Sequence, residues 1–145
     1  MASLNTLIDY AKSMLGLPYI WGKESPSYGV DCSGFVQLVL RSVGLDPKGD
    51  QSAQMLYDWC LKSAFMAERD TGALAFYGKD ASHVSHVAIL INQFQIIEAG
   101  GGDHICTTPE AAAAKGACVR IRPFGHRPDF VGLFMPDYPE WVGLL

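Results

Sequence analysis

The sequence lacks the patterns that mark secreted, membrane and multidomain proteins. No apolar run approaches the ~18 residues that a membrane-spanning helix requires. The first ten residues have neither the basic nor the long apolar segment of a secretory signal peptide. We therefore expect a chain made in the cytoplasm without a membrane span, which needs delivery to act elsewhere. Repeats, low-complexity tracts and linkers are also missing, so the 145 residues predict a single domain over residues 1–145.

An excess of basic charge is missing too. Eleven Lys and Arg residues face 15 Asp and Glu residues, giving a formal charge of -4 and a pI near 5.4. Nucleic acid and anionic membranes are therefore not expected as partners. Nearly half of the residues (49%) are hydrophobic, which is enough to form a core without disulfides or a structural metal.

Short metal-binding and redox motifs are likewise lacking. The chain has four cysteines but no Cys-x-x-Cys pair, and no His-Glu-x-x-His segment. Cys60 and Cys118 lie in apolar segments and are predicted to be buried, whereas Cys106 falls in a polar loop. We predict no metal and no cofactor. One metal alternative, without supporting spacing, is a histidine cluster: His83, His86 and His104.

Hydrophobic periodicity places helices first and strands second. Helical spacing predicts helices over 4–15, about 32–43 and about 52–60, separated by a loop at 22–29. Five strands are expected later, with one or two helical turns at 107–115: 73–77, 84–91, 94–99, 117–123 and 130–135. This order predicts an α+β domain in which N-terminal helices pack on a central antiparallel sheet.

Cys32 stands at the predicted start of the second helix. The amides and dipole of a helix N-terminus lower the pKa of a thiol, and the same amides can stabilise an oxyanion. Gly34 would let a substrate backbone approach closely. These features favour a catalytic cysteine, although a buried structural cysteine at a helix start fits the position equally well.

His86 and Glu98 lie on the two strands of a predicted hairpin around Asn92 and Gln93. A cysteine nucleophile needs a base within reach, and that base commonly lies far along the chain. If the hairpin loop has an odd length, His86 lies opposite Glu98, which can then orient the imidazole. The alternatives are a hydrogen-bonded core histidine and a surface glutamate.

Four segments in the same order resemble the NlpC/P60 family of cell-wall peptidases. They are the opening block Gly16–Gly22, the nucleophile block Asp31–Val36, the strand Thr71–Tyr77 and the histidine strand Ser85–Ile91. The sequence departs from the family pattern at Ala73, where an aspartate is usual, and at the single Gly22. It no longer follows the pattern after residue 122.

The resemblance implies a papain-like α+β fold and hydrolysis of peptidoglycan stem peptides. The expected bond joins γ-D-glutamate to diaminopimelate or lysine. Cys32 would be the nucleophile, His86 the base and Glu98 the third residue. The family pattern also implies substrate binding by three residues, each with a structural alternative: Tyr19 (covering the core), Asp31 (capping the helix) and Ser33 (bonding the backbone).

The absence of a signal peptide and of wall-binding repeats favours a phage lysin, a phage tail hydrolase or a delivered antibacterial toxin. Such a protein would act on the wall and would have a delivery or virion-tail partner. Alternatives are an enzyme that recycles wall peptides, an acyltransferase or deamidase with the same Cys–His pair, and an inactive structural module of a phage tail. The aromatic tail 136–145 is expected to pack on the domain, or else on a partner.

Overall fold

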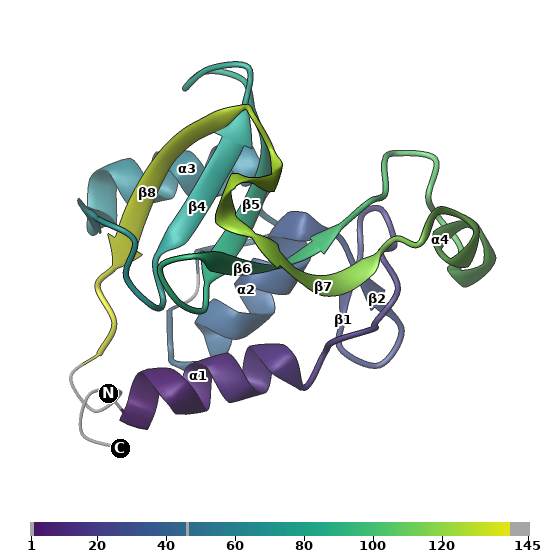
Figure 1. Ribbon diagram of the computed structural model, residues 1–145, viewed down its shortest axis with the longest axis horizontal. Coiled ribbons are helices and arrows are strands. Elements are labelled where there is room, and N and C mark those ends of the chain that lie inside the picture. Colours follow the sequence, from purple (N-terminus) through teal and green to yellow (C-terminus); the bar gives the residue numbers. More distant parts are fainter. Residues whose placement is uncertain (1, 46, 140–145) are drawn as a thin grey trace.

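A six-stranded antiparallel sheet forms the centre of the computed structural model, which describes residues 2–45 and 47–139. The strand order is β3-β8-β4-β5-β6-β7, and helices α2 and α3 lie together on one face of the sheet (Figure 1). In chain order the helices and strands of the sheet are α1 (Ala2–Lys12), α2 (Cys32–Ser42), α3 (Ala53–Ser63), β3 (Ala64–Met66), β4 (Leu74–Gly78), β5 (Val84–Leu90), β6 (Gln95–Gly100), α4 (Pro109–Lys115), β7 (Cys118–Pro123) and β8 (Phe130–Pro136). The predicted α+β fold is confirmed.

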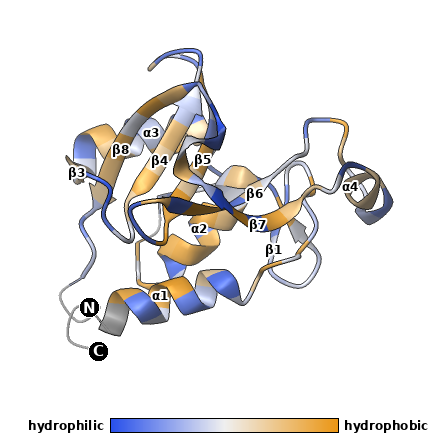
Figure 2. Cartoon of the chain, in the orientation of Figure 1, coloured by the Kyte–Doolittle hydropathy of each residue, from blue (hydrophilic) through white to orange (hydrophobic). Residues whose placement is uncertain are grey.

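Helix α2 is held in place by a capped start and a largely apolar surface. Asp31 is its N-cap, and its side chain accepts a hydrogen bond from the Gly34 amide. Phe35, Val36, Val39 and Leu40 are fully buried, which favours folding by about 1.5–3 kcal/mol for each large side chain. The apolar face of α2 therefore rests on β5 and β6 and fixes the position of residue 32 beside these strands (Figure 2).

The alternation along the strands separates two apolar clusters. Val87 and Ile89 of β5 join the main core with the helices, whereas Ala88 and Leu90 join a smaller cluster on the other face. Phe124, in the short 3-10 helix η1 (Phe124–His126), packs against this second face. His86 lies two residues before Ala88 on β5, and Glu98 lies two residues after Ile96 on β6. Because the side chains of a strand alternate between its two faces, His86 and Glu98 point to the second face.

The β5–β6 hairpin has the odd loop on which the predicted meeting of His86 and Glu98 depends. Ile91 N–H bonds to the Gln95 carbonyl, leaving the three residues Asn92–Phe94 as the loop. Cross-strand pairing joins Ile89 to Ile97 and Leu90 to Ile96, although the strands run on to Val84 and Gly100. Beyond this pairing, both strands border the same cleft.

Several local predictions are wrong. Helix α1 ends at Lys12, three residues before the predicted end, and the predicted loop holds the short strands β1 (Glu24–Ser25) and β2 (Gly29–Val30). Strand β3 was not predicted. Its side chains are half-buried or exposed, so its sequence carries no burial pattern.

One of the cysteines differs from its predicted burial. Cys60 is buried as predicted, whereas Cys118, also predicted to be buried, is only half-buried. Cys106, whose burial the sequence left open, is fully buried. In the tail, the Tyr138 hydroxyl donates to the Gly72 carbonyl at 2.7 Å, while residues 140–145 lie outside the described part of the chain. Among the described helices, none combines the length and apolar character needed to cross a membrane.

Candidate active site

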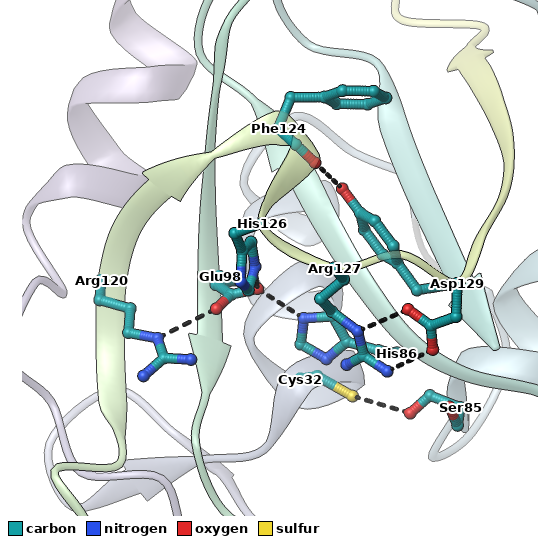
Figure 3. A network of polar contacts seen from close by, with 10 residues as sticks. Cys32, Ser85, His86, Glu98, Arg120, Phe124, His126, Arg127 and Asp129 are labelled. Atoms are coloured by element: carbon teal, nitrogen blue, oxygen red, sulfur yellow. Dashed lines mark hydrogen bonds and ion pairs between the residues drawn. The ribbon is translucent and has the colours of Figure 1, made fainter.

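Cys32 is the first residue of α2, and its thiol lies against the start of β5. Its Sγ atom donates a weak hydrogen bond to the Ser85 carbonyl, with a separation of 3.9 Å (Figure 3). Burial and the charge of Asp31 raise the pKa of the Cys32 thiol to about 12, although the backbone amides of Val87 and Ser33 act in the opposite direction. The predicted lowering of this pKa is therefore wrong, because the loss of hydration outweighs the helix N-terminus.

Gly34 has a packing role in addition to the predicted one. A Cβ atom at this position would lie 2.4 Å from the Lys23 carbonyl oxygen and 2.9 Å from Asp31 Oδ1. The absence of a side chain therefore lets the segment before β1 pass close to the helix start. Close approach of a substrate backbone to Gly34 stays a prediction.

His86 and Glu98 meet in a buried contact. The distance from His86 Nε2 to Glu98 Oε1 is 2.7 Å, and both side chains are almost fully buried. The register differs by two residues from the predicted one, because continuing the Ile89–Ile97 pairing would place Glu98 opposite Ala88. A shift of two keeps the face, and diagonal neighbours remain within reach of long side chains.

Glu98 is also bound by two residues that sequence reasoning missed. Arg120, its direct partner on β7, donates from Nε to Oε2 at 3.0 Å, and His126 Nε2 lies 3.2 Å from Oε1. Burial alone would raise the pKa of Glu98. The hydrogen bond and charge of His86, the hydrogen bond of Arg120 and the charge of His126 outweigh it and lower this pKa to about 2. Glu98 is therefore ionised at neutral pH.

The segment after β7 adds an ion pair next to this network. Arg127 Nε and Nη2 donate to the two carboxylate oxygens of Asp129 at 2.9 and 2.7 Å (Figure 3). The Arg127 guanidinium also stands over the ring of Tyr77, which is fully buried. No sequence signal identified Arg127 or Asp129, because both follow the last segment that resembles a known pattern. Arg120 could have been identified as a partner of Glu98 only from the pairing register of β6 and β7.

These groups and the three predicted substrate-binding residues line one cleft of about 1000 Å³. Its lining includes Cys32, His86 and Glu98 together with Tyr19, Asp31 and Ser33. Arg120, His126 and Arg127 line the same cleft, as do three acidic residues: Asp31, Asp50 and Asp103. A substrate lying over Cys32 would therefore meet both cationic and anionic groups.

The structure gives Asp31 and Ser33 local roles at the helix start. Asp31 accepts from the amides of Gly34 at 2.8 Å and Gly22 at 3.0 Å, and the Ser33 hydroxyl donates to Asp31 Oδ1 at 3.3 Å. Burial is the main cause that raises the pKa of Asp31. Capping by Asp31 is confirmed, while substrate binding by either residue stays a prediction.

Tyr19 is clamped by the loop that follows β6. Its side chain is 5% exposed, and a Cβ atom at Gly102 would lie 2.1 Å from its ring, so the loop backbone packs directly against the ring. Burial and the charges of Cys32 and Asp31 raise the pKa of the Tyr19 hydroxyl, which is therefore protonated at neutral pH. Tyr19 can present a fixed hydroxyl to the cleft.

The predicted alternative of a histidine metal site finds no support in the described residues. His83 is exposed and pairs with Asp80, with Nδ1 2.7 Å from Oδ1, and His104 packs edge-on against Trp21. Across residues 2–45 and 47–139, no group of three or more His, Cys, Asp or Glu side chains is placed to hold a metal ion.

Comparison with known proteins gives a consistent family. The sequence model of the NlpC/P60 family matches residues 16–123. The γ-D-glutamyl-L-lysine dipeptidyl-peptidase of Bacillus cereus is 33% identical over 93 residues, which cover 63% of this chain and 27% of that protein. The peptidoglycan endopeptidase RipB of Mycobacterium tuberculosis is 36% identical over 110 residues, covering 66% of this chain and 42% of RipB.

The fold agrees with that match. The crystal structure of an NLP/P60 family protein from Staphylococcus aureus superposes with a TM-score of 0.70 at 22% identity, covering 95% of this chain and 42% of that one. The chain thus spans less than half the length of each of these three relatives. Because the family match extends over most of the chain and includes the segments that carry Cys32, His86 and Glu98, the chain belongs to the NlpC/P60 family.

Proposed function

We propose that the chain is a cysteine endopeptidase that hydrolyses peptidoglycan stem peptides after γ-D-glutamate, at the bond to diaminopimelate or lysine. The observation that carries the proposal is the buried His86–Glu98 pair beside Cys32 in one open cleft. The names of the Bacillus cereus and Mycobacterium tuberculosis relatives, which refer to γ-D-glutamyl-L-lysine and to peptidoglycan, support the substrate class.

The hydrogen bonds of Glu98 assign the protons of His86. An ionised carboxylate only accepts hydrogen bonds, so the contact to Glu98 requires the hydrogen of His86 to reside on Nε2. In the neutral imidazole, Nδ1 is then the free acceptor. His86 is thereby prepared to take a proton from the Cys32 thiol, and Glu98 stabilises the imidazolium that results.

The reaction is an acyl transfer through the thiol. Because the pKa of Cys32 is raised to about 12, its proton has to move to His86 as Sγ attacks the γ-glutamyl carbonyl. Backbone amides at the start of α2 stabilise the oxyanion. His86 then protonates the leaving amine, and water releases the acyl group from Cys32, giving a free γ-carboxylate.

The test is to incubate wild type and Cys32→Ala with intact peptidoglycan and with a free L-Ala-γ-D-Glu-diaminopimelate tripeptide, and to identify the products by mass spectrometry. Cleavage after γ-D-Glu by wild type alone supports the proposal. A new amide or ester would indicate an acyltransferase, and loss of an amide nitrogen alone would indicate a deamidase. Absence of any Cys32-dependent product from either substrate would contradict the proposal and favour a structural module.

The same experiment addresses the biological role. We infer a wall-directed enzyme, as in a phage lysin, a tail hydrolase or a delivered toxin, which acts on the cell wall after delivery or lysis. The charged lining of the cleft suits the mixed charges of a stem peptide. Faster cleavage of the intact wall than of the free tripeptide is the expected result, whereas the reverse preference would indicate recycling of wall peptides.

A further inference from the structure

The guanidinium group of Arg127 is held in place by contacts within the chain. Two of its three guanidinium nitrogens, Nε and Nη2, bind the Asp129 carboxylate in a bidentate pair at 2.9 and 2.7 Å. The guanidinium carbon lies 5.5 Å from the centre of the Tyr77 ring. This geometry fixes the plane of the guanidinium before any ligand binds.

Tyr77, the platform under Arg127, is itself fixed. It is fully buried, and its hydroxyl donates to the Phe124 carbonyl at 3.0 Å. Phe130 packs against both Tyr77 and Phe124, with ring centroids 5.9 and 5.2 Å apart. The segment from Phe124 to Phe130 is therefore anchored at both ends, and it carries Arg127 between these anchors.

The third nitrogen, Nη1, has no hydrogen-bond or ion-pair partner in the part of the chain that the structure describes. Arg127 lines the cleft together with Cys32 and His86. The charges of Arg127 and of a Cys32 thiolate each influence the pKa of the other group, which places the guanidinium within electrostatic reach of the nucleophile. A preorganised N–H donor with positive charge is thus available in the cleft that also holds the reacting sulfur.

We propose that Nη1 of Arg127 binds a substrate carboxylate next to the scissile amide and so determines specificity for the non-amidated stem peptide. The inference rests on the proposed function, because it assigns a specificity residue to that same cleft. Arg127 lies outside residues 16–123, the segment that the family model matches.

Two carboxylates of the substrate have the required chemistry. One is the α-carboxylate of the γ-linked glutamate, which stays free because the peptide bond uses the side-chain carboxyl. The other is the α-carboxylate of the leaving diamino acid, which is free in the tripeptide. Either would accept a charge-assisted hydrogen bond from Nη1 while Asp129 continues to hold Nε and Nη2.

The experiment compares four forms of the L-Ala-γ-D-Glu-L-Lys tripeptide, whose leaving lysine has a single carboxylate: one with both carboxylates, one amidated at the glutamate, one amidated at the lysine, and one amidated at both. Values of kcat/KM are measured for wild type, Arg127→Gln and Arg122→Gln. Arg122 lies on β7 opposite Ile96 and is not among the described residues that line the cleft, so it controls for loss of one positive charge. Thermal unfolding of each variant verifies folding.

Wild type and Arg122→Gln should lose about tenfold in kcat/KM when the relevant carboxylate is amidated, the lower range for a hydrogen bond to a charged group. Arg127→Gln should be about tenfold slower than wild type on the carboxylate peptide and should no longer distinguish the amide. The single amide that reproduces the loss identifies which carboxylate is bound.

The inference is overturned if wild type cleaves all four peptides equally. That comparison needs no substitution, so it remains decisive even if Arg127→Gln does not fold. An equal loss on all four peptides with folded Arg127→Gln would also overturn it, because Arg127 would then only support the site. If wild type shows no Cys32-dependent cleavage of any peptide, the proposed function itself fails, and the inference fails with it.

Discussion

Replacing Glu98 by glutamine removes the carboxylate that His86, Arg120 and His126 share, while keeping nearly the same volume. Glu98 has no exposed surface, so water cannot take over the lost charge interactions. The shift of its pKa from the ordinary 4.5 to about 2 corresponds to about 3 kcal/mol of folding free energy at neutral pH. For a chain of this size, that loss lowers the melting temperature by about 6–12 °C.

The pH dependence separates this interaction from a simple packing defect. The folded-state pKa of Glu98 lies below its unfolded-state value, so the contribution is complete above pH 4.5 and is lost as the pH falls towards about 2. Glutamine does not titrate. The difference in free energy of unfolding between wild type and Glu98→Gln should therefore be about 3 kcal/mol at pH 7 and should shrink steadily below pH 4.5.

Urea unfolding at a series of pH values from 7 to 3 measures this difference directly. Other carboxylates with lowered pKa values, such as Asp103 and Asp129, titrate in both proteins and cancel in the comparison. A Glu98→Gln protein as stable as wild type at pH 7 would refute the reasoning. So would a difference that does not change between pH 5 and pH 3.

Three further predictions concern the neighbours of Glu98 and the nucleophile. The rate at which iodoacetamide alkylates Cys32, followed by mass spectrometry, should be low at pH 7 and should rise about tenfold per pH unit up to pH 10, because burial raises the pKa of the thiol to about 12. A rate that levels off near neutral pH would contradict this. His126→Ala removes one of the two imidazoles on Glu98 Oε1 and should lower kcat by about tenfold with little change in KM, since His126 positions Glu98; an unchanged kcat would show that His86 and Arg120 suffice. Asp31→Asn keeps the oxygen that caps the Gly34 amide but places an NH2 group where the Gly22 amide needs an acceptor, so it should cost about 1 kcal/mol, and Asp31→Ala, which loses both acceptors, should cost more. If Asp31 also binds a substrate amine, both variants raise KM for the tripeptide, and an unchanged KM with Asp31→Asn would leave capping as its role.

Local sequence patterns correctly predicted the helices and strands whose apolar residues recur at the expected period and are buried in the structure. Helix α2 and strands β4 to β6 are regular and almost fully buried, so their apolar positions determine both type and extent. Strand β3 was missed because two of its three residues are exposed and its pairing with β8 joins segments 70 residues apart. The burial of Cys106 depends on a loop that packs under Tyr19, and no local pattern reports such packing.

The sequence predicted those residues of the candidate site that lie in recognisable sequence motifs. The odd loop correctly placed His86 and Glu98 on one face, although the register was shifted by two residues. The thiol pKa was predicted in the wrong direction because a helix N-terminus is visible in sequence, whereas the burial of Cys32 is not. Arg120 and His126 converge on Glu98 only through tertiary structure, which the chain order does not reveal.

The central claim is that Cys32 cleaves the bond after γ-D-glutamate. The most direct measurement is hydrolysis of a γ-D-Glu-diaminopimelate tripeptide in H₂¹⁸O by wild type and by Cys32→Ala, with the products identified by mass spectrometry. The account predicts one ¹⁸O atom in the new γ-carboxylate with wild type and no product with Cys32→Ala. Equal release of product by the two proteins, or wild-type cleavage at another bond, would contradict it.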